Sequence, residues 1–218
     1  MILFIAVIAL ALLVGLLLRG SVRRFEQLHL RWWGLVIAGL GIQFVPLPNS
    51  RAGTDLLVRV AVLSCSYSLL VIFASLNARL PGMALVLLGL VLNAAVIIPN
   101  GGMPVSENAL ERSGQQDLLR VLIDQGAAKH HLMTDDDVLT PLADVIAIPK
   151  PLGQIVSVGD LVLYAGVVWL IVAVMLGRTR SPVPEERGRY RGKHRAGASG
   201  AAPTPAPPSP ATTWGAAP

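Results

Sequence analysis

Two aspartates and a histidine, Asp144, Asp160 and His130, are the side chains of this sequence best suited to acid–base chemistry. Asp160 ends the stretch "SVGD", just before an apolar block that is long enough to enter a membrane. An aspartyl mechanism needs two carboxylates that share a proton and activate water, and Asp144 is the candidate partner upstream. A helix cap formed by Ser157 or Asp160 explains the same residues without catalysis, and we favour that interpretation.

The stretch "KHHLMTDDD" at 129–137 contains nitrogen and oxygen donors suited to a divalent metal, with His130 and Asp135 as the candidates. Adjacent histidines rarely converge on one ion, and no recognised spacing such as HExxH is present. The stretch is better explained as a solvated, acidic helix start with Thr134 as its N-cap. We therefore predict no metal site and no cofactor.

The stretch "PNGGMPVSENAL" at 99–110 permits two interpretations. As structure it is a sharp turn, because proline ends a helix, glycine adopts positive φ and asparagine bonds backbone groups. As a site it lets a ligand approach the backbone, whose N–H groups can form an anion-binding concavity. The turn is the favoured interpretation. The ligand-binding candidates are Asn100, Gly101, Gly102, Met103 and Ser106.

The elements that position these residues belong to an unusually apolar chain. Of its 218 residues, 53% are hydrophobic and 14% are charged, a composition outside the usual range of soluble domains. The apolar residues gather in blocks of about 17 to 20, the length that crosses roughly 30 Å of hydrocarbon as a helix. We predict an all-α integral membrane fold with five transmembrane helices, at about residues 2–18, 32–48, 57–76, 83–98 and 161–177.

Basic residues predict the orientation of these helices. Four of them, Arg19, Arg23, Arg24 and Arg31, follow the first block, and seven of the eighteen basic residues lie at 178–195, after the last block. The positive-inside rule places both groups in the cytoplasm, with the N-terminus outside and the C-terminus cytoplasmic. Orientation explains the basic charge, so we predict no nucleic-acid partner. The first block has no basic residue before it, which indicates a retained helix and not a cleaved signal peptide.

We predict two parts in the chain, a membrane domain at 1–180 and a disordered cytoplasmic tail at 181–218. The tail is basic and then rich in alanine and proline, so it lacks the apolar surface that folding requires. Within the first part, residues 99–160 are expected to form a small helical extracytoplasmic cap, and residues 99–159 of it carry four basic and eight acidic side chains.

The helices of this cap are expected at three places. Ser106 can cap one helix, an apolar stripe within 118–123 indicates a second, and Thr140 followed by proline indicates the start of a third. Small residues spaced four apart in the apolar blocks, such as Ala11 and Gly15, predict that the membrane helices pack as a bundle.

Five short motifs, in a fixed order, resemble a known family. They are "RWW" (31–33), "NGGMPVS" (100–106), "KHHL" (129–132), "PLADVIAIP" (141–149) and "SVGD" (157–160). Together they resemble an uncharacterised family of bacterial multi-pass membrane proteins, domain of unknown function 5317. The resemblance implies a location in the bacterial cytoplasmic (inner) membrane and carries no established activity.

A fainter similarity is to the lipoprotein signal peptidases, four-helix membrane aspartyl proteases with an "FNxAD" motif before their last helix. The stretch "IVSVGD" at 155–160 stands in the corresponding place. This resemblance implies that Asp160 is one catalytic aspartate and Asp144 the other. The Asn-Ala pair of the motif is absent, and the number of spans differs.

No nucleophile, metal or acid–base set meets a recognised spacing, so we expect a non-catalytic protein. It would be a scaffold, an accessory subunit or a sensor in the lipid bilayer, whose outer cap binds a ligand, another membrane protein or a second copy of the chain. The alternative is a membrane-embedded hydrolase that acts at the outer face through Asp144 and Asp160, with His130 as a further candidate. No acidic or basic residue lies at mid-membrane, apart from Arg59 near the start of the third predicted span, whereas an ion-coupled transporter needs such groups on its path.

Overall fold

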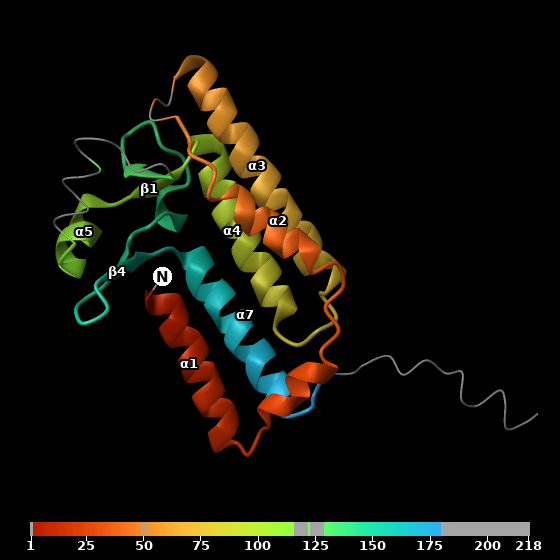
Figure 1. Cartoon of the computed structure of the whole chain (residues 1–218). Helices are drawn as coiled ribbons and strands as arrows, with labels where there is room; N and C mark the ends of the chain where they lie inside the picture. The colour runs from red at the N-terminus through yellow and green to blue at the C-terminus, as the bar shows by residue number, and fades with distance from the viewer. Residues whose placement is uncertain (1, 49, 51, 116–121, 123–128, 180–218) are drawn as a thin grey trace, which may run out of the picture. The chain divides into compact units, whose positions relative to one another are not determined.

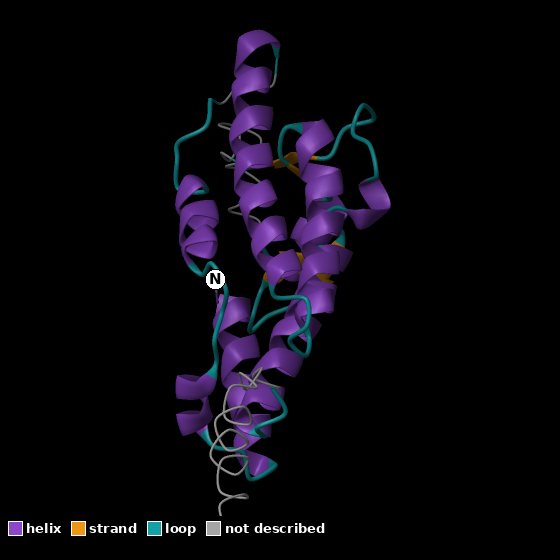
Figure 2. Ribbon diagram, turned by 90° about the vertical axis from the view of Figure 1, so that its right-hand side faces the viewer, coloured by secondary structure: helices purple, strands orange, loops and turns teal. Residues whose placement is uncertain are grey.

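Apolar helices make up most of the chain that the computed structural model describes, namely residues 2–48, 50, 52–115, 122 and 129–179 (Figure 1; Figure 2). The longer helices are α1 (Ile2–Leu17), α3 (Gly53–Leu76), α4 (Met83–Asn100) and α7 (Val158–Met175). The shorter ones are α2 (Gly34–Ile42), α5 (Glu107–Ser113) and the 3-10 helices η1 (Val22–Gln27) and η2 (Thr140–Leu142). The predicted helical, apolar character of the chain is confirmed.

Three of the described helices, α3, α4 and α7, are long and apolar enough to cross a membrane. The two shorter ones have 18 residues each, which corresponds to a rise of about 27 Å. Helix α1 is equally apolar but has 16 residues. Four of the five predicted spans therefore correspond to apolar helices, of which three reach the length of a membrane crossing.

The second predicted span, 32–48, contains a much shorter helix than expected. Helix α2 has nine residues, a rise of about 14 Å and roughly half of the hydrocarbon thickness. The helix ends before two prolines, Pro46 and Pro48, which cannot continue it because they lack a backbone N–H and restrict the preceding residue. The chain nevertheless follows the whole of α3, since Arg31 is hydrogen-bonded to Asn77 at one end and Pro48 to Arg59 near the other.

Helices α4 and α7 are antiparallel and pack through glycines that the sequence analysis did not single out. A Cβ at Gly166 would lie 2.6 Å from the backbone nitrogen of Val86, and one at Gly89 would lie 2.5 Å from the carbonyl oxygen of Gly159. Small residues allow such close backbone approach between apolar helices. This register brings Asn93 next to Gly159, so α7 begins about two turns before α4 ends.

The other helix pairs also meet at small residues. Gly39 of α2 lies against Leu70 of α3, where the Ser66 hydroxyl donates a hydrogen bond to the Gly39 carbonyl at 2.8 Å. Gly15 of α1 lies against Met175 of α7, as the predicted close packing of α1 requires.

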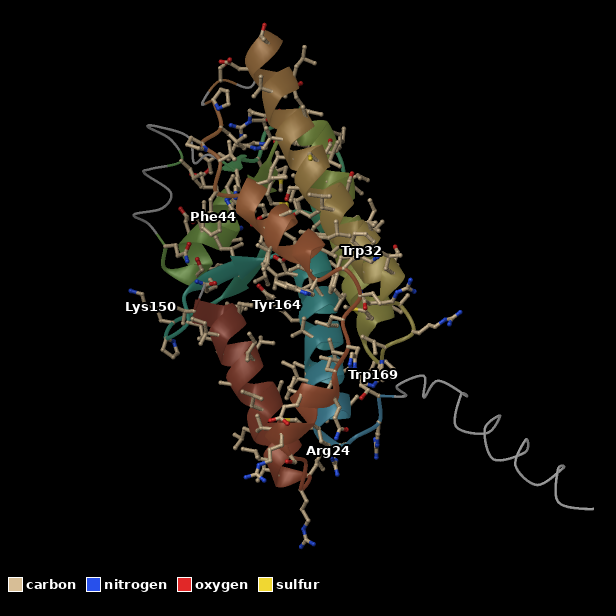
Figure 3. All side chains as sticks on the ribbon, turned by 45° about the vertical axis from the view of Figure 1, so that its right-hand side comes forward. Arg24, Trp32, Phe44, Lys150, Tyr164 and Trp169 are labelled. Carbon is tan, nitrogen blue, oxygen red and sulfur yellow. The ribbon has the colours of Figure 1, made fainter. Side chains whose placement is uncertain are left out.

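Helix η1 and the C-terminal end of α7 lie together at one end of the bundle. Arg24 of η1 donates a hydrogen bond to the carbonyl of Met175 at 2.8 Å. Figure 3 shows Arg24 at this end, with Trp32 and Trp169 on the outer surface of the helices, where both are exposed. The described residues of the cap, 101–115, 122 and 129–157, lie at the other end, next to the N-terminus of α7 (Figure 1).

The segment between α4 and α7 contains strands as well as helices. Strands β1 (Met103–Val105) and β2 (His130–Leu132) are parallel, with Met103 opposite His130, and β3 (Ile146–Ile148) and β4 (Gln154–Val156) are antiparallel. Val105 also pairs with Asp144 as an isolated bridge. The expectation of an entirely helical cap is therefore wrong, because these short segments complete the backbone hydrogen bonds of one another.

Two predicted helix starts in the cap are corrected. Thr134 begins a turn and not a helix, since the Asp137 carboxylate accepts hydrogen bonds from the Thr134 N–H and hydroxyl at 2.8 and 3.1 Å. Thr140 begins the single turn η2. By contrast, Ser106 caps α5 as predicted. Of the predicted helix at 118–123 only Leu122 is described, and the predicted tail at 181–218 lies outside the described residues.

Candidate functional site

A small cavity lies where α7 begins, between the helices and the strands of the cap. Its volume is about 160 Å³. The sequence candidates Asp144, Asp160, His130 and Met103 all line this cavity, although they come from separate segments. The other lining residues are Gln43, Leu63, Tyr67, Asn93, Ile97 and Lys129.

The offset of α4 and α7 along the bundle produces this cavity, although the two helices are equal in length. Because α7 starts beside Asn93, the last two turns of α4 continue past it, and Ile97 forms part of the cavity wall. Tyr67 of α3 lines the same space, and Gln43 lines it from the residue that follows α2. Polar groups from three helices thus reach a space next to the first turn of α7.

Asp160 is held in place by hydrogen bonds from two elements. The side-chain amide of Asn93 donates to Oδ1 of Asp160 at 2.7 Å, and the backbone N–H of Ser157 donates to Oδ2 at 3.2 Å. The Ser157 hydroxyl accepts from the Asp160 N–H at 3.0 Å and donates to Oδ1 of Asn93 at 2.9 Å. The predicted cap at Ser157 and Asp160 is confirmed as a capping box, and Asn93 extends it to α4.

Asp144 is fixed by its backbone, while one oxygen of its side chain is left without a partner. Its N–H donates to the carbonyl of Pro104 at 3.1 Å, and its carbonyl accepts from the N–H of Ser106 at 3.0 Å. The residue is 6% exposed, and Oδ1 has no hydrogen-bond partner among the described residues. Burial, with the added effect of the negative charge on Asp160, raises the pKa of Asp144 to about 8. At neutral pH this carboxyl is mostly protonated.

His130 and Lys129 are the basic side chains of the cavity. Nε2 of His130 lies 3.7 Å from Oδ2 of Asp144, too far for a hydrogen bond. Desolvation lowers the pKa of His130 and the charge of Asp160 opposes this, but half of the side chain is exposed, so water weakens both effects. Desolvation also lowers the pKa of Lys129. The cavity therefore combines two carboxyl groups with an imidazole and an amine whose pKa values are lowered by desolvation.

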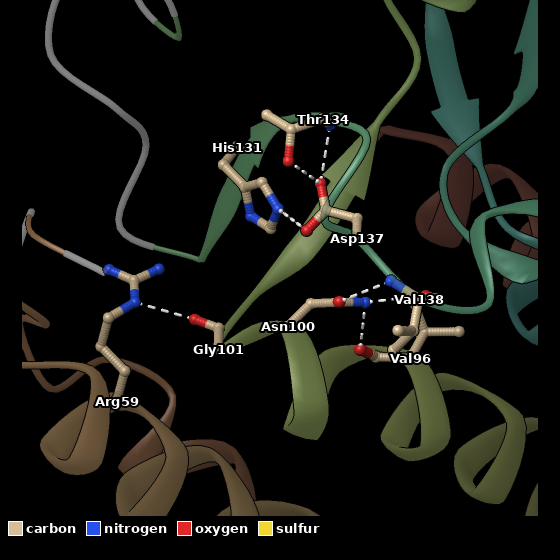
Figure 4. A network of polar contacts seen from close by, with 8 residues as sticks. All are labelled: Arg59, Val96, Asn100, Gly101, His131, Thr134, Asp137 and Val138. Carbon is tan, nitrogen blue, oxygen red and sulfur yellow. Dashed lines mark hydrogen bonds and ion pairs between the residues drawn. The ribbon is translucent and has the colours of Figure 1, made fainter. Parts of the chain in front are cut away.

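The turn "NGG" at 100–102 contributes to structure, and its residues do not line the cavity (Figure 4). The Asn100 side chain donates to the carbonyls of Val96 and Val138 and accepts from the Val138 N–H, each at 2.9 Å. Gly101 has φ of 62°, a conformation suited to glycine at a helix end. Its carbonyl accepts a hydrogen bond from Nε of Arg59 at 2.8 Å.

Gly102 lies at a point where the backbone is crowded. A Cβ there would be 3.0 Å from the carbonyl oxygen of Lys129 and 3.1 Å from a guanidinium nitrogen of Arg59. Arg59 itself is 2% exposed and donates a second hydrogen bond to the carbonyl of Pro48 at 2.6 Å. The three glycine-turn candidates therefore connect α3, α4 and the cap.

His131 and Asp137 form a second buried pair (Figure 4). Nε2 of His131 lies 2.9 Å from Oδ1 of Asp137. Burial would raise the pKa of Asp137, but hydrogen bonds from Thr134 and His131 outweigh it and lower the pKa. The pair stabilises the turn at 134–137.

The remaining candidates, Ser106 and Asp135, lie apart from the cavity. Both line a wider, open depression of about 590 Å³ beside α5. Ser106 accepts a hydrogen bond from the N–H of Ala109 at 3.4 Å. Within the described residues, no group of three histidine, cysteine, aspartate or glutamate side chains is placed to hold a metal ion.

Sequence reasoning did not select four polar residues of the cavity: Gln43, Tyr67, Asn93 and Lys129. Gln43 and Asn93 stand singly in or next to apolar blocks, and Tyr67 lies in the short polar run at 64–68. This is a usable signal, because isolated polar groups inside a membrane face an interior or a cavity. The signal does not indicate which of them meet. Their meeting depends on the register of α4 against α7.

Comparison with known proteins gives a family and no activity. A family of unknown function, DUF5317, matches residues 27–172. An uncharacterised protein of Thermotoga maritima is 34% identical over 125 residues, which cover 56% of this chain and 69% of that protein. No solved structure matches the chain. The predicted resemblance is thus confirmed, and the chain belongs to the DUF5317 family.

Proposed function

We propose that this chain is a multi-pass protein of the bacterial cytoplasmic membrane, with the cap at 101–157 outside. The basic residues Arg19, Arg23 and Arg24 lie near the end of the bundle opposite the cap, in agreement with the positive-inside rule. Many large apolar side chains of α1, α3 and α7 are exposed, as lipid-facing residues are. Residues 31–53 complete a crossing beside α3 although α2 is short.

We further propose that the protein is a non-catalytic sensor or accessory subunit whose cavity binds a small polar ligand. One observation carries this proposal: Oδ1 of the buried Asp144 carboxyl has no partner among the described residues, and Asp144 lines a cavity together with Asp160 and His130. An unsatisfied buried polar atom costs roughly 1–3 kcal/mol. A ligand that forms a hydrogen bond to this oxygen recovers that cost. The resulting change in the structure of the cap can then be transmitted to a partner protein.

The test uses the full-length protein in lipid nanodiscs and a panel of small cationic, neutral and anionic solutes. At least one solute is expected to raise the thermal unfolding midpoint in a saturable way, because a ligand that binds the folded state stabilises it. Asp144→Asn should remove this effect, whereas Asp136→Asn, at an exposed position of the same cap, should keep it. If no solute distinguishes the two variants, the cavity is not a binding site.

A membrane-embedded hydrolase is the second candidate. It is favoured by the presence of two carboxyl groups in one cavity, of which Asp144 is mostly protonated and Asp160 accepts hydrogen bonds. Acid–base catalysis by paired carboxyls requires such unequal protonation. The His130 imidazole near Asp144 is a further proton acceptor.

Turnover separates the two candidates. A hydrolase should cleave a fluorogenic lipopeptide in nanodiscs, and both Asp144→Asn and Asp160→Asn should abolish the cleavage. A binding protein should leave the substrate intact. Retention of cleavage in either variant would remove the paired-carboxyl mechanism.

A further inference from the structure

We infer that the cavity at the start of α7 accepts a primary ammonium group, which Asp144 and Asp160 bind. This inference rests on the proposed ligand-binding function and specifies its ligand. Ethanolamine lipid headgroups and free small amines both carry this group.

The acceptors of the cavity match a donor-rich cation. Oδ1 of Asp144 is buried without a partner among the described residues, and Asp144 lines the cavity. The Asp160 carboxylate accepts one hydrogen bond from Asn93 and one from Ser157, which leaves lone pairs on both oxygens. The Tyr67 hydroxyl is a further acceptor on the wall. A primary ammonium group has three N–H donors to satisfy them.

Charge argues against an anionic ligand at the same position. An anion would meet the Asp160 carboxylate and would further disfavour ionisation of Asp144. The capping box of Ser157 and Asp160 also places the Asp160 carboxylate at the N-terminus of α7, so an anion there would meet a negative charge. Lys129 is the one lysine or arginine that lines the cavity, so it can contact an anionic part of a zwitterionic ligand.

Size restricts the ligand to a small group. A volume of about 160 Å³ equals about five water molecules at roughly 30 Å³ each, enough for the ammonium and two carbons of ethanolamine. A complete metabolite of drug size requires about 300 Å³ or more. The cavity therefore suits the end of a lipid headgroup or a free amine of a few atoms.

Binding of a cation should be coupled to release of a proton. Without ligand, the raised pKa of Asp144 keeps its carboxyl mostly protonated at neutral pH. An ammonium group favours the ionised carboxylate, so the proton leaves when the cation binds. The other titratable groups that line the cavity are Asp160, His130, Lys129 and Tyr67. Below pH 8, the affinity for the cation should therefore increase by up to about tenfold for each unit by which the pH is raised.

The experiment is calorimetric titration of the full-length protein in phosphatidylcholine nanodiscs with methylammonium chloride. We expect saturable binding and release of up to one proton, read from buffers of different ionisation enthalpy. Tetramethylammonium, which has the same charge but no N–H donors, and acetamide, which is neutral, should not bind. Asp144→Asn should weaken binding about tenfold or more, the effect of one lost hydrogen bond to a charged group, and Asp136→Asn should not.

Tyr67→Phe provides a second test that does not change a carboxyl. It should weaken methylammonium binding and leave folding intact, so the inference can be examined even if Asp144→Asn does not fold. Nanodiscs that contain phosphatidylethanolamine should compete with methylammonium if the lipid headgroup is the source of the group. Absence of competition would indicate a free amine.

The two proposals fail in different ways. Asp144-dependent binding of acetamide or acetate in place of methylammonium would overturn the ammonium inference and keep the ligand-binding function. Equal binding of methylammonium and tetramethylammonium would show a general cation effect and would also overturn the inference. If none of the probes binds, both proposals are wrong.

Discussion

The side-chain amide of Asn93 donates a 2.7 Å hydrogen bond to Oδ1 of Asp160, so the middle of α4 is tied to the first turn of α7. The other end of the same amide accepts a hydrogen bond from Ser157. One side chain therefore bonds two residues of the helix cap. This tie sets both the register of two antiparallel helices and the position of the carboxylate in the cavity.

Asn93→Ala should destabilise the protein by about 1–3 kcal/mol, because it leaves the Ser157 hydroxyl and one Asp160 oxygen buried without this partner. Reversible unfolding in denaturant measures the loss. Asn108→Ala, at an exposed position of α5, is the matched control and should change stability little. Equal effects of the two variants would mean that the Asn93 bonds do not stabilise the fold.

Gly166→Ala should be more damaging than its size suggests. The new Cβ would lie 2.6 Å from the nitrogen of Val86 and 2.7 Å from the carbonyl of Gly82. These are backbone atoms, so α4 and α7 must separate, at a cost of about 1–3 kcal/mol. Gly41→Ala in α2 has open space around it and should be neutral or stabilising by up to about 1 kcal/mol. Similar melting points for the two variants would contradict close packing at this glycine.

Some of these elements could be predicted from the sequence, and others could not. Block length and apolar composition indicated the long helices, and Ser157 with Asp160 indicated the cap of α7. The half-length of α2 was missed because apolar residues, interrupted only by Gln43, continue up to Pro46 in the sequence, and composition does not reveal where an apolar segment leaves the helical conformation. The three-residue strands were missed because they are too short to show a two-residue period.

The residues of the candidate site could be predicted from the sequence, but their arrangement in space could not. Asp144, Asp160 and His130 were selected for their chemistry, and all three line one cavity. Their proximity depends on the bridge between Val105 and Asp144 and on the start of α7 beside Asn93. Such long-range contacts leave no local periodicity in one sequence.

The Asp144 carboxyl should make the folded protein less stable as the pH rises from about 4 to 8. Its pKa is about 8 in the folded protein and about 3.9 in an unfolded chain, so the folded state binds more protons between these values. The slope reaches at most about 1.4 kcal/mol per pH unit. His130 and Asp137 also titrate, so the difference between wild type and Asp144→Asn isolates this effect. A difference that is constant with pH would refute the raised pKa.

Arg59→Lys should loosen the turn at 100–103 without unfolding the helices. A lysine has no second nitrogen to donate to both the Gly101 and Pro48 carbonyls as the guanidinium does. Hydrogen exchange of the amides of Gly101, Gly102 and Met103 should therefore become faster. Arg79→Lys, at an exposed position, is the control and should leave the exchange of these three amides unchanged. Unchanged exchange in Arg59→Lys as well would mean that the guanidinium does not hold the turn.

The proposed orientation predicts opposite labelling of the two ends of the bundle. In a Cys65→Ala background, Asn108→Cys in α5 should react with a membrane-impermeant thiol reagent added to intact spheroplasts. Arg23→Cys in η1 should react only after the membrane is permeabilised. Both positions are exposed, so burial does not explain a difference, and η1 is tied to the end of α7 by the bond from Arg24 to Met175. Labelling of both cysteines in intact cells would mean that the helices between them do not separate two compartments, and the reverse pattern would place the cavity at the cytoplasmic face.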